Sequence, residues 1–116
     1  MKKLGQSMGW ALSGLKYTIL AERNMKIHLA AALAVFALAG WLGLSRMEWG
    51  LLVLTVFLVL VAEMVNTSIE KTVDMVTQEY HPLAYTAKNV AAGAVLLAAV
   101  NAIIMGLVIF LPHLSR

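Results

Sequence analysis

The chain has 116 residues, of which 61% are hydrophobic and 13% are charged, and its formal net charge is +3. A water-soluble domain of this length could not bury so much apolar surface, so the composition and the mean hydropathy of +0.83 indicate an integral membrane protein. Cysteine is absent, which excludes disulfide bonds and thiolate metal sites, and no basic patch interleaved with aromatic residues points to nucleic acid.

Residues 1–26 are expected to form a cytoplasmic segment that carries an amphipathic helix lying in the membrane interface. Apolar and polar positions are mixed along this segment, where Trp10, Leu15 and Tyr17 are interspersed with serine, lysine and threonine. The net positive charge is concentrated here, and basic residues at this position suit the anionic cytoplasmic leaflet of a membrane.

Three apolar stretches follow, and each is long enough as a helix to cross a hydrocarbon core of about 27–30 Å. They are residues 27–44, 49–65 and 90–111. The first contains His28, which is expected to be a packed or interfacial side chain rather than a ligand, and the third contains Asn101. Pro112 is expected to end the third helix, because proline has no N–H to donate. Residues 1–116 are therefore predicted to be one all-α membrane domain with an interfacial helix and three transmembrane helices.

Basic residues that flank the apolar stretches indicate the orientation of the chain. Five precede the first stretch, whereas the turn after it carries Arg46, whose charge is offset by Glu48. The amino terminus and residues 71–88 are therefore expected to face the cytoplasm from a multi-pass position in the cell inner membrane. His113 would lie outside in an exposed tail and would be solvated.

A ridge of small residues is predicted on the third apolar stretch, where Ala94, Ala98, Ala102 and Gly106 recur every four positions. Small residues let membrane helices approach closely, although alanine and glycine are also simply common in such helices. Close packing is the favoured interpretation. Because three short spans make a thin bundle, a homo-oligomer is expected.

A polar stripe follows the second apolar stretch, in residues 63–74, which read EMVNTSIEKTVD. On a helix that turns about 100° per residue, Glu63, Asn66, Glu70 and Asp74 fall within an arc of about 80°. A charged residue at the centre of a bilayer costs about 2.5–3.5 kcal/mol on insertion scales, so such residues usually mark function. A solvated helix end would explain Asp74, but it explains Glu63 poorly because four apolar residues precede it.

The acidic groups, which include Glu22 before the first span, suit Mg²⁺, a hard cation that one or two carboxylates hold together with substrate phosphates. Lys88, at the start of the third helix, would suit the phosphates themselves. Phosphoryl transfer also needs a group that accepts the proton of the acceptor hydroxyl, and Glu63 is the most deeply placed candidate. No Walker-type glycine loop or kinase catalytic-loop motif is present, so any kinase here lies outside those folds.

Three sequence motifs carry a specific resemblance. Residues 22–28 read ERNMKIH, residues 63–74 form the polar stripe, and residues 81–96 read HPLAYTAKNVAAGAVL. With these motifs the chain resembles the prokaryotic diacylglycerol kinase family from about residue 7 to residue 111. That family comprises small trimeric membrane lipid kinases, and the first and third motifs resemble its Gram-positive branch, whose members phosphorylate undecaprenol.

The resemblance implies roles for individual residues. Glu63 would be the general base, Glu22 and Glu70 would hold the Mg²⁺ that bridges the ATP phosphates, and Asp74 would support the site. The residues implied in nucleotide binding are Lys3, Trp10, Asn66, Tyr80, His81, Lys88 and Asn89. At Asn89 the family usually has aspartate, and the lost charge predicts a weaker hold on the nucleotide or its metal.

The function implied by the resemblance is ATP-dependent phosphorylation of undecaprenol to undecaprenyl phosphate by a homotrimer. The alternatives are a diacylglycerol kinase that makes phosphatidic acid, or a non-catalytic small membrane subunit such as part of a transporter. A carrier would place its charges near the middle of the membrane in broken helices, whereas these charges gather at the membrane boundary.

Overall fold

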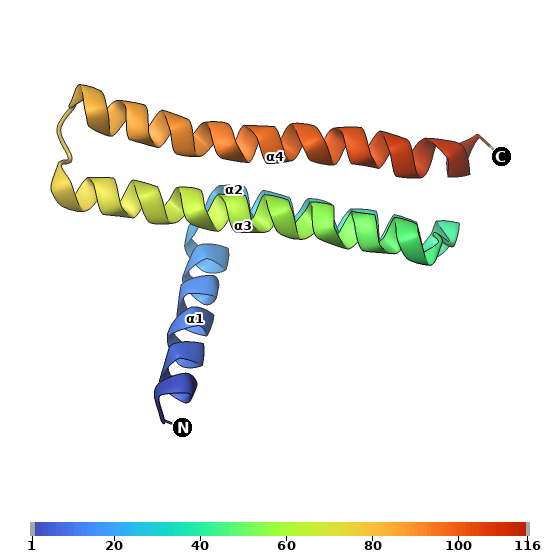
Figure 1. The fold of residues 1–116 in the computed structure, drawn as a ribbon, viewed down its shortest axis with the longest axis horizontal. Coiled ribbons are helices and arrows are strands. Elements are labelled where there is room, and N and C mark those ends of the chain that lie inside the picture. The colour runs from blue at the N-terminus through green and yellow to red at the C-terminus, as the bar shows by residue number, and fades with distance from the viewer. Residues whose placement is uncertain (1, 116) are drawn as a thin grey trace.

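The computed structural model describes residues 2–115, and within that range the chain forms four helices. They are α1 (Lys2–Ala21), α2 (Arg23–Leu42), α3 (Arg46–Val76) and α4 (Pro82–Leu114). Helices α2, α3 and α4 run alongside one another, and α1 projects away from the side of this bundle (Figure 1). All three bundle helices are long and apolar enough to cross a membrane, so the prediction of an all-α chain with three such helices is confirmed.

The turn between α2 and α3 is fixed by residues 43–45, and we call this end of the bundle the turn end. Gly43 has φ 72° and ψ 59°, a left-handed conformation that glycine adopts without steric penalty, and its N–H donates to the Ala39 carbonyl at 3.1 Å. Ser45 then caps α3. Its hydroxyl accepts from the Glu48 N–H at 3.2 Å, while the Ser45 N–H donates to Glu48 Oε1 at 2.9 Å. Local sequence therefore determines this reversal of the chain.

Helix α3 continues well past its apolar stretch, because its 31 residues include the whole polar stripe. At about 1.5 Å per residue it is about 46 Å long, which exceeds the hydrocarbon core of about 30 Å. Residues 77–81 connect it to α4, and we call this the loop end of the bundle. Helix α4 begins at Pro82 in the favoured first position, and the ring of His81 caps it by accepting from the Leu83 N–H at 3.1 Å.

The prediction that Pro112 ends the last helix is wrong, since α4 continues to Leu114. Proline removes only one N–H from the ladder so near the helix end, and the Ser115 N–H still closes the last turn on the Leu111 carbonyl at 3.1 Å. This extra turn carries His113 against the start of α3. There its Nε2 lies 3.0 and 2.9 Å from the two carboxylate oxygens of Glu48. The expectation that His113 is solvated is therefore also wrong, because its side chain is only 4% exposed.

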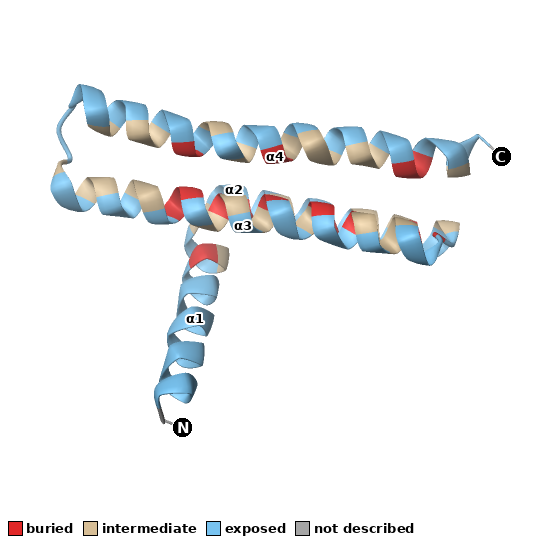
Figure 2. Ribbon diagram, in the orientation of Figure 1, coloured by how far each residue is buried: buried red, intermediate tan, exposed pale blue. Residues whose placement is uncertain are grey.

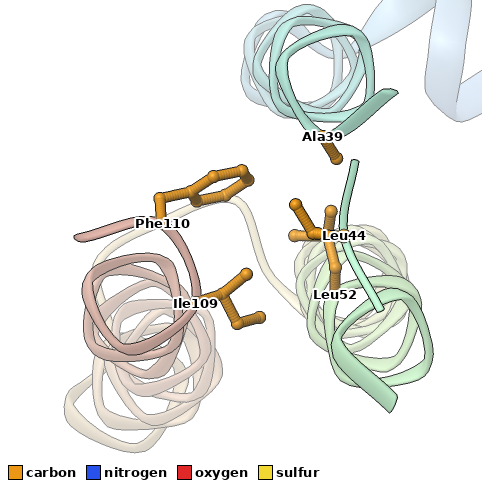
Figure 3. Packing of buried hydrophobic residues seen from close by; sticks show 5 residues of the cluster. All are labelled: Ala39, Leu44, Leu52, Ile109 and Phe110. Carbon is orange, nitrogen blue, oxygen red and sulfur yellow. The ribbon is translucent and has the colours of Figure 1, made fainter. Parts of the chain in front are cut away.

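The main apolar cluster lies at the turn end, where all three bundle helices meet (Figure 3). Its buried members are Ala39, Leu44, Leu52, Ile109 and Phe110. Helix α3 is the central element, since it packs extensively against α4 and also contacts α2, and burial is concentrated along it (Figure 2). Helix α1 is almost wholly exposed (Figure 2). The main buried apolar cluster of the bundle therefore lies at its turn end and not at its loop end.

Candidate functional site

The polar stripe of α3 runs from the interior of the bundle to the loop end. Glu63 and Asn66 are buried, whereas Glu70 and Asp74 are partly exposed. Among the described acidic residues, Glu63 is the only one in the buried class, with a relative exposure of 1%. The stripe therefore joins a carboxylate in an apolar interior to carboxylates at the solvent-accessible end of the same rigid helix.

The Glu63 carboxylate is buried without adequate partners. Its Oε2 atom makes no hydrogen bond to any described residue, and the Nε2 atom of His28 lies 3.5 Å away. Helix α3 supports the backbone at this point through the Thr67 hydroxyl, which donates to the Glu63 carbonyl at 3.0 Å. Buried polar atoms are normally hydrogen-bonded, so this carboxylate oxygen lacks the donor that a buried site normally supplies.

Asn66 and Glu70 form the second part of the site. They lie one helical turn apart, and the Asn66 amide Nδ2 donates to Glu70 Oε1 at 2.8 Å. The Asn66 Oδ1 atom is buried and unpaired among the described residues. A free amide oxygen beside a carboxylate is a hard-oxygen donor set of the kind that Mg²⁺ prefers, so these residues fit the expected cation. Within residues 2–115 no group of three histidine, cysteine or acidic side chains is placed to hold a metal ion.

Glu22 reaches the same region from the junction of α1 and α2. It occupies the N-cap position of α2 without a capping hydrogen bond from its side chain, so its carboxylate is not committed to the helix. Lys71, beyond the apolar stretch of α3, lies with its Nζ 5.7 Å from the centre of the Tyr17 ring. The Tyr17 hydroxyl is the main group that raises the pKa of Lys71, and the carboxylates of Glu22 and Asp74 add to this effect. The last turn of α1 therefore meets α3 beside the polar stripe.

An ion pair joins α3 and α4 at the loop end. The Lys88 Nζ donates to Asp74 Oδ1 at 2.6 Å, and both side chains are partly exposed. Exposed ion pairs contribute about 0–1 kcal/mol, so Lys88 can leave Asp74 for a phosphate at little energetic cost. Lys88 also lines a shallow hollow with Tyr80 and His81. Tyr85 lines the same hollow, and the centre of its ring lies 5.8 Å from the centre of the Tyr80 ring.

An apolar groove runs between α2, α3 and α4, from His28 toward Phe110. Small side chains widen it on both sides. They are Ala31 and Ala32 from α2, and Ala99, Ala102 and Gly106 from α4. Thr55 also lines the groove, but its hydroxyl donates to the Leu51 carbonyl at 2.7 Å and is not free. The groove is therefore suited to an apolar chain. His28 lines one end of it and lies 3.5 Å from Glu63 Oε2.

Comparison with known proteins decides the family. The family model for prokaryotic diacylglycerol kinase matches residues 9–110. The chain belongs to the prokaryotic diacylglycerol kinase family. It is 46% identical to the undecaprenol kinase of Bacillus subtilis over 101 residues. These aligned residues cover 87% of this chain and 82% of the Bacillus protein. The resemblance predicted from the motifs is thus confirmed.

Two further relatives bear the name diacylglycerol kinase. The protein of Synechocystis is 43% identical over 109 residues, covering 93% of this chain but only 62% of that longer protein. The protein of Escherichia coli is 31% identical over 108 residues, covering 93% of this chain and 88% of that protein. Family membership and the three apolar helices together make this kinase-family chain a multi-pass membrane protein.

The structure of this diacylglycerol kinase family member places most of the residues predicted for its site along α3 and at the loop end. Glu63, Asn66, Glu70 and Asp74 share one side of α3. Lys88, Tyr80 and His81 line the hollow at the loop end, and Asn89 is exposed on α4 next to Lys88. Their catalytic and binding roles remain predictions.

Two predicted nucleotide contacts, Lys3 and Trp10, lie apart from these residues. Both are exposed on α1, Trp10 with 70% of its surface, and only the last turn of α1 approaches the polar stripe (Figure 1). A single chain therefore does not bring them to the stripe.

His28 has a contact that the sequence did not reveal. Its side chain is 21% exposed, which fits the expected packed or interfacial position, but its Nε2 also lies 3.5 Å from Glu63 Oε2 while its ring lines the groove. An ionisable residue at the start of an apolar span is in general a functional candidate, and that signal was available in the sequence. Its partner was not, because the contact joins two helices whose relative placement depends on tertiary packing.

Proposed function

We propose that this chain is an ATP-dependent kinase that phosphorylates undecaprenol to undecaprenyl phosphate. The observation that carries the proposal is the buried Glu63 carboxylate, which lies 3.5 Å from the ring of His28, a residue that lines one end of an apolar groove. A lipid alcohol combines an apolar chain with one hydroxyl, and this site offers a complementary surface to each part. The 46% identity to a relative named undecaprenol kinase favours undecaprenol as the alcohol.

In the proposed reaction Glu63 acts as the general base. Its carboxylate takes the proton of the lipid hydroxyl while the hydroxyl oxygen attacks the γ-phosphorus of ATP. The bond between that phosphorus and the oxygen bridging to the β-phosphate breaks, and ADP leaves with the electron pair. The proton on Glu63 then passes to water. A positioned base of this kind typically contributes about 10²–10⁴-fold to the rate.

The residues toward the loop end would hold the nucleotide. Glu70, the free Asn66 oxygen and the uncommitted Glu22 carboxylate would bind the cation that accompanies ATP. Mg²⁺ bound there would neutralise charge on the phosphates during transfer. Lys88 would exchange Asp74 for a phosphate oxygen, and Asp74 would keep the lysine in position between reactions. Tyr80, His81 and the exposed Asn89 would lie near the nucleotide.

We further propose that the active form is a homotrimer with its loop end and amino terminus on the cytoplasmic side of the inner membrane. The basic residues of α1 support this orientation. Helix α1 would lie in the interface, and its Lys3 and Trp10 would serve the nucleotide site of a neighbouring chain. The many exposed apolar residues of α4, such as Leu96 and Leu97, are available for contacts with lipid or with other chains.

The decisive experiment uses the purified protein in detergent with Mg-ATP and compares undecaprenol with diacylglycerol as acceptors. Faster phosphorylation of undecaprenol supports the proposal. Preference for diacylglycerol would instead assign the activity named for the Synechocystis and Escherichia coli relatives. Transfer to neither lipid by a correctly assembled protein would favour a non-catalytic membrane subunit.

A further inference from the structure

The Glu63 carboxylate needs a group that fixes its orientation. Its side chain is only 2% exposed, and Oε2 makes no hydrogen bond within the described chain. A carboxylate that rotates freely presents its proton-accepting lone pair to a substrate only part of the time. Bases that act on hydroxyl groups are accordingly oriented by a third group in many enzymes.

His28 is the ionisable side chain that the structure places against Oε2. It comes from the second turn of α2, and its Nε2 lies 3.5 Å from the oxygen, a few tenths of an ångström beyond a good N–H···O hydrogen bond. The side chain is 21% exposed and lines the apolar groove. The imidazole is thus the side chain that links the groove to the Glu63 carboxylate.

We propose that His28 is a positioning residue for the general base. When a lipid alcohol occupies the head of the groove, the Nε2–H donates to Glu63 Oε2, which turns Oε1 toward the lipid hydroxyl. This inference rests on the proposed function, and it adds a residue that holds the base without touching the phosphates. It requires the imidazole tautomer, or the protonated ring, that carries hydrogen on Nε2.

The test uses substitutions that separate the two ring nitrogens. A glutamine amide nitrogen reaches about as far as histidine Nε2, whereas an asparagine amide nitrogen reaches about as far as Nδ1. His28→Gln should therefore keep kcat within about threefold, whereas His28→Asn and His28→Leu should lose about 10–100-fold, the range expected when a reacting group is misplaced by about 1 Å. The KM for Mg-ATP should stay unchanged in all three variants, because His28 does not touch the nucleotide site.

The control is a second histidine with the same kind of partner. His113 contacts the Glu48 carboxylate through Nε2 at the opposite end of the bundle. The series His113→Gln, His113→Asn and His113→Leu should change the midpoint of thermal unfolding but leave kcat unaltered. Assembly of every variant is checked by size-exclusion chromatography, and if His28→Leu fails to assemble, the comparison of glutamine with asparagine decides.

Three results would overturn the inference while leaving the proposed function intact. They are full activity of His28→Leu, equal loss in His28→Gln and His28→Asn, or a change confined to the KM for Mg-ATP. A wild-type protein that phosphorylates neither lipid would overturn the proposed function and this inference together.

Discussion

The two ends of the bundle each hold a glutamate beside a histidine, and the two pairs differ in how well they are satisfied. At the turn end Glu48 accepts from the Ser45 N–H and contacts His113 at 2.9 Å, so its oxygens are fully engaged. Toward the loop end the Glu63 oxygen next to His28 has no hydrogen bond, and the described chain has just one other buried, unpaired side-chain atom, Asn66 Oδ1, on the same stripe. Buried polar groups are normally hydrogen-bonded, so the two unpaired atoms on the stripe need an explanation that the Glu48 carboxylate does not. The contrast separates a satisfied pair at the turn end from the pair that we propose to take part in the reaction.

The largest effect on the rate is expected when the Glu63 carboxylate is removed. Glu63→Gln keeps the shape of the side chain but replaces one acceptor oxygen with an NH2 donor and removes the basic carboxylate. We expect kcat to fall by about 10²–10⁴-fold, measured with undecaprenol and Mg-ATP in detergent. Glu48→Gln is the matched variant at the turn end and should leave kcat unaltered. Near-normal turnover of a correctly assembled Glu63→Gln protein would remove Glu63 from the mechanism.

The second prediction concerns the two carboxylates assigned to the cation. Glu22→Gln and Glu70→Gln should each raise the Mg²⁺ concentration needed for half-maximal rate. Because both act on one ion, the double variant should deviate from additivity by about 0.5–3 kcal/mol, or about 2–150-fold. A Mg²⁺ titration of the four proteins measures this coupling. Additive effects that do not depend on metal would point to separate structural roles.

Mixed oligomers test whether Glu22 and Glu70 of one site come from different chains. If each site combines residues of neighbouring chains, coexpression of Glu22→Gln chains with Glu70→Gln chains should restore activity in a fraction of the sites. The measurement is the rate of tagged, demonstrably mixed oligomers against each variant alone. A complete lack of rescue would indicate that each site is built within one chain.

A smaller effect is expected at Asn89, where the family usually has aspartate. Asn89 is exposed beside Lys88, so an added carboxylate would be screened by solvent and is worth about 0.2–1 kcal/mol. Asn89→Asp should therefore lower the KM for Mg-ATP by about 1.5- to 5-fold. Kinetics across a Mg²⁺ titration provide the check. An unchanged or raised KM at every metal concentration would mean that the neighbouring residues are already adapted to asparagine.

The smallest effect on the rate is expected at the turn end. Ser45→Ala removes the hydroxyl that caps α3 and should lower the free energy of unfolding by about 0.5–2 kcal/mol. Because this end takes no part in the reaction, kcat at a temperature where the protein stays folded should remain unchanged. Thermal unfolding and kinase assays on one preparation test both parts. A parallel loss of kcat would show that the two ends are coupled through α3.

Local patterns in the sequence were sufficient for the helices and for the stripe. Apolar stretches predict helices α2, α3 and α4, and the period of about 100° places Glu63 and Asp74 on one side of α3, as the structure confirms. The same local reasoning failed at Pro112, because a single missing N–H near the end of a helix is too small a defect to terminate it. It failed at His113 because the partner, Glu48, is 65 positions away in the sequence.

The features that the sequence did not reveal are contacts between helices. Neither the distance between His28 and Glu63 nor the groove beside them follows from periodicity, since both depend on how α2 packs on α3. The small-residue ridge illustrates this limit. Ala98 is buried, as close packing requires, but Ala102 and Gly106 line the groove and provide space there.

The unbroken length of α3 has a consequence for the membrane in which the protein sits. Glu63 and Glu70 are fixed on one rod, about 10 Å apart along its axis, and no hinge lies between them. When the hydrocarbon core becomes thinner, a helix of this length responds by tilting rather than by compressing. Tilting would carry the base and the cation ligands together to a new depth while the lipid headgroups stay at theirs. If Glu63 is the base, as we propose, bilayer thickness would then set how well the hydroxyl of the lipid lines up with it, and turnover would depend on acyl-chain length in the host membrane.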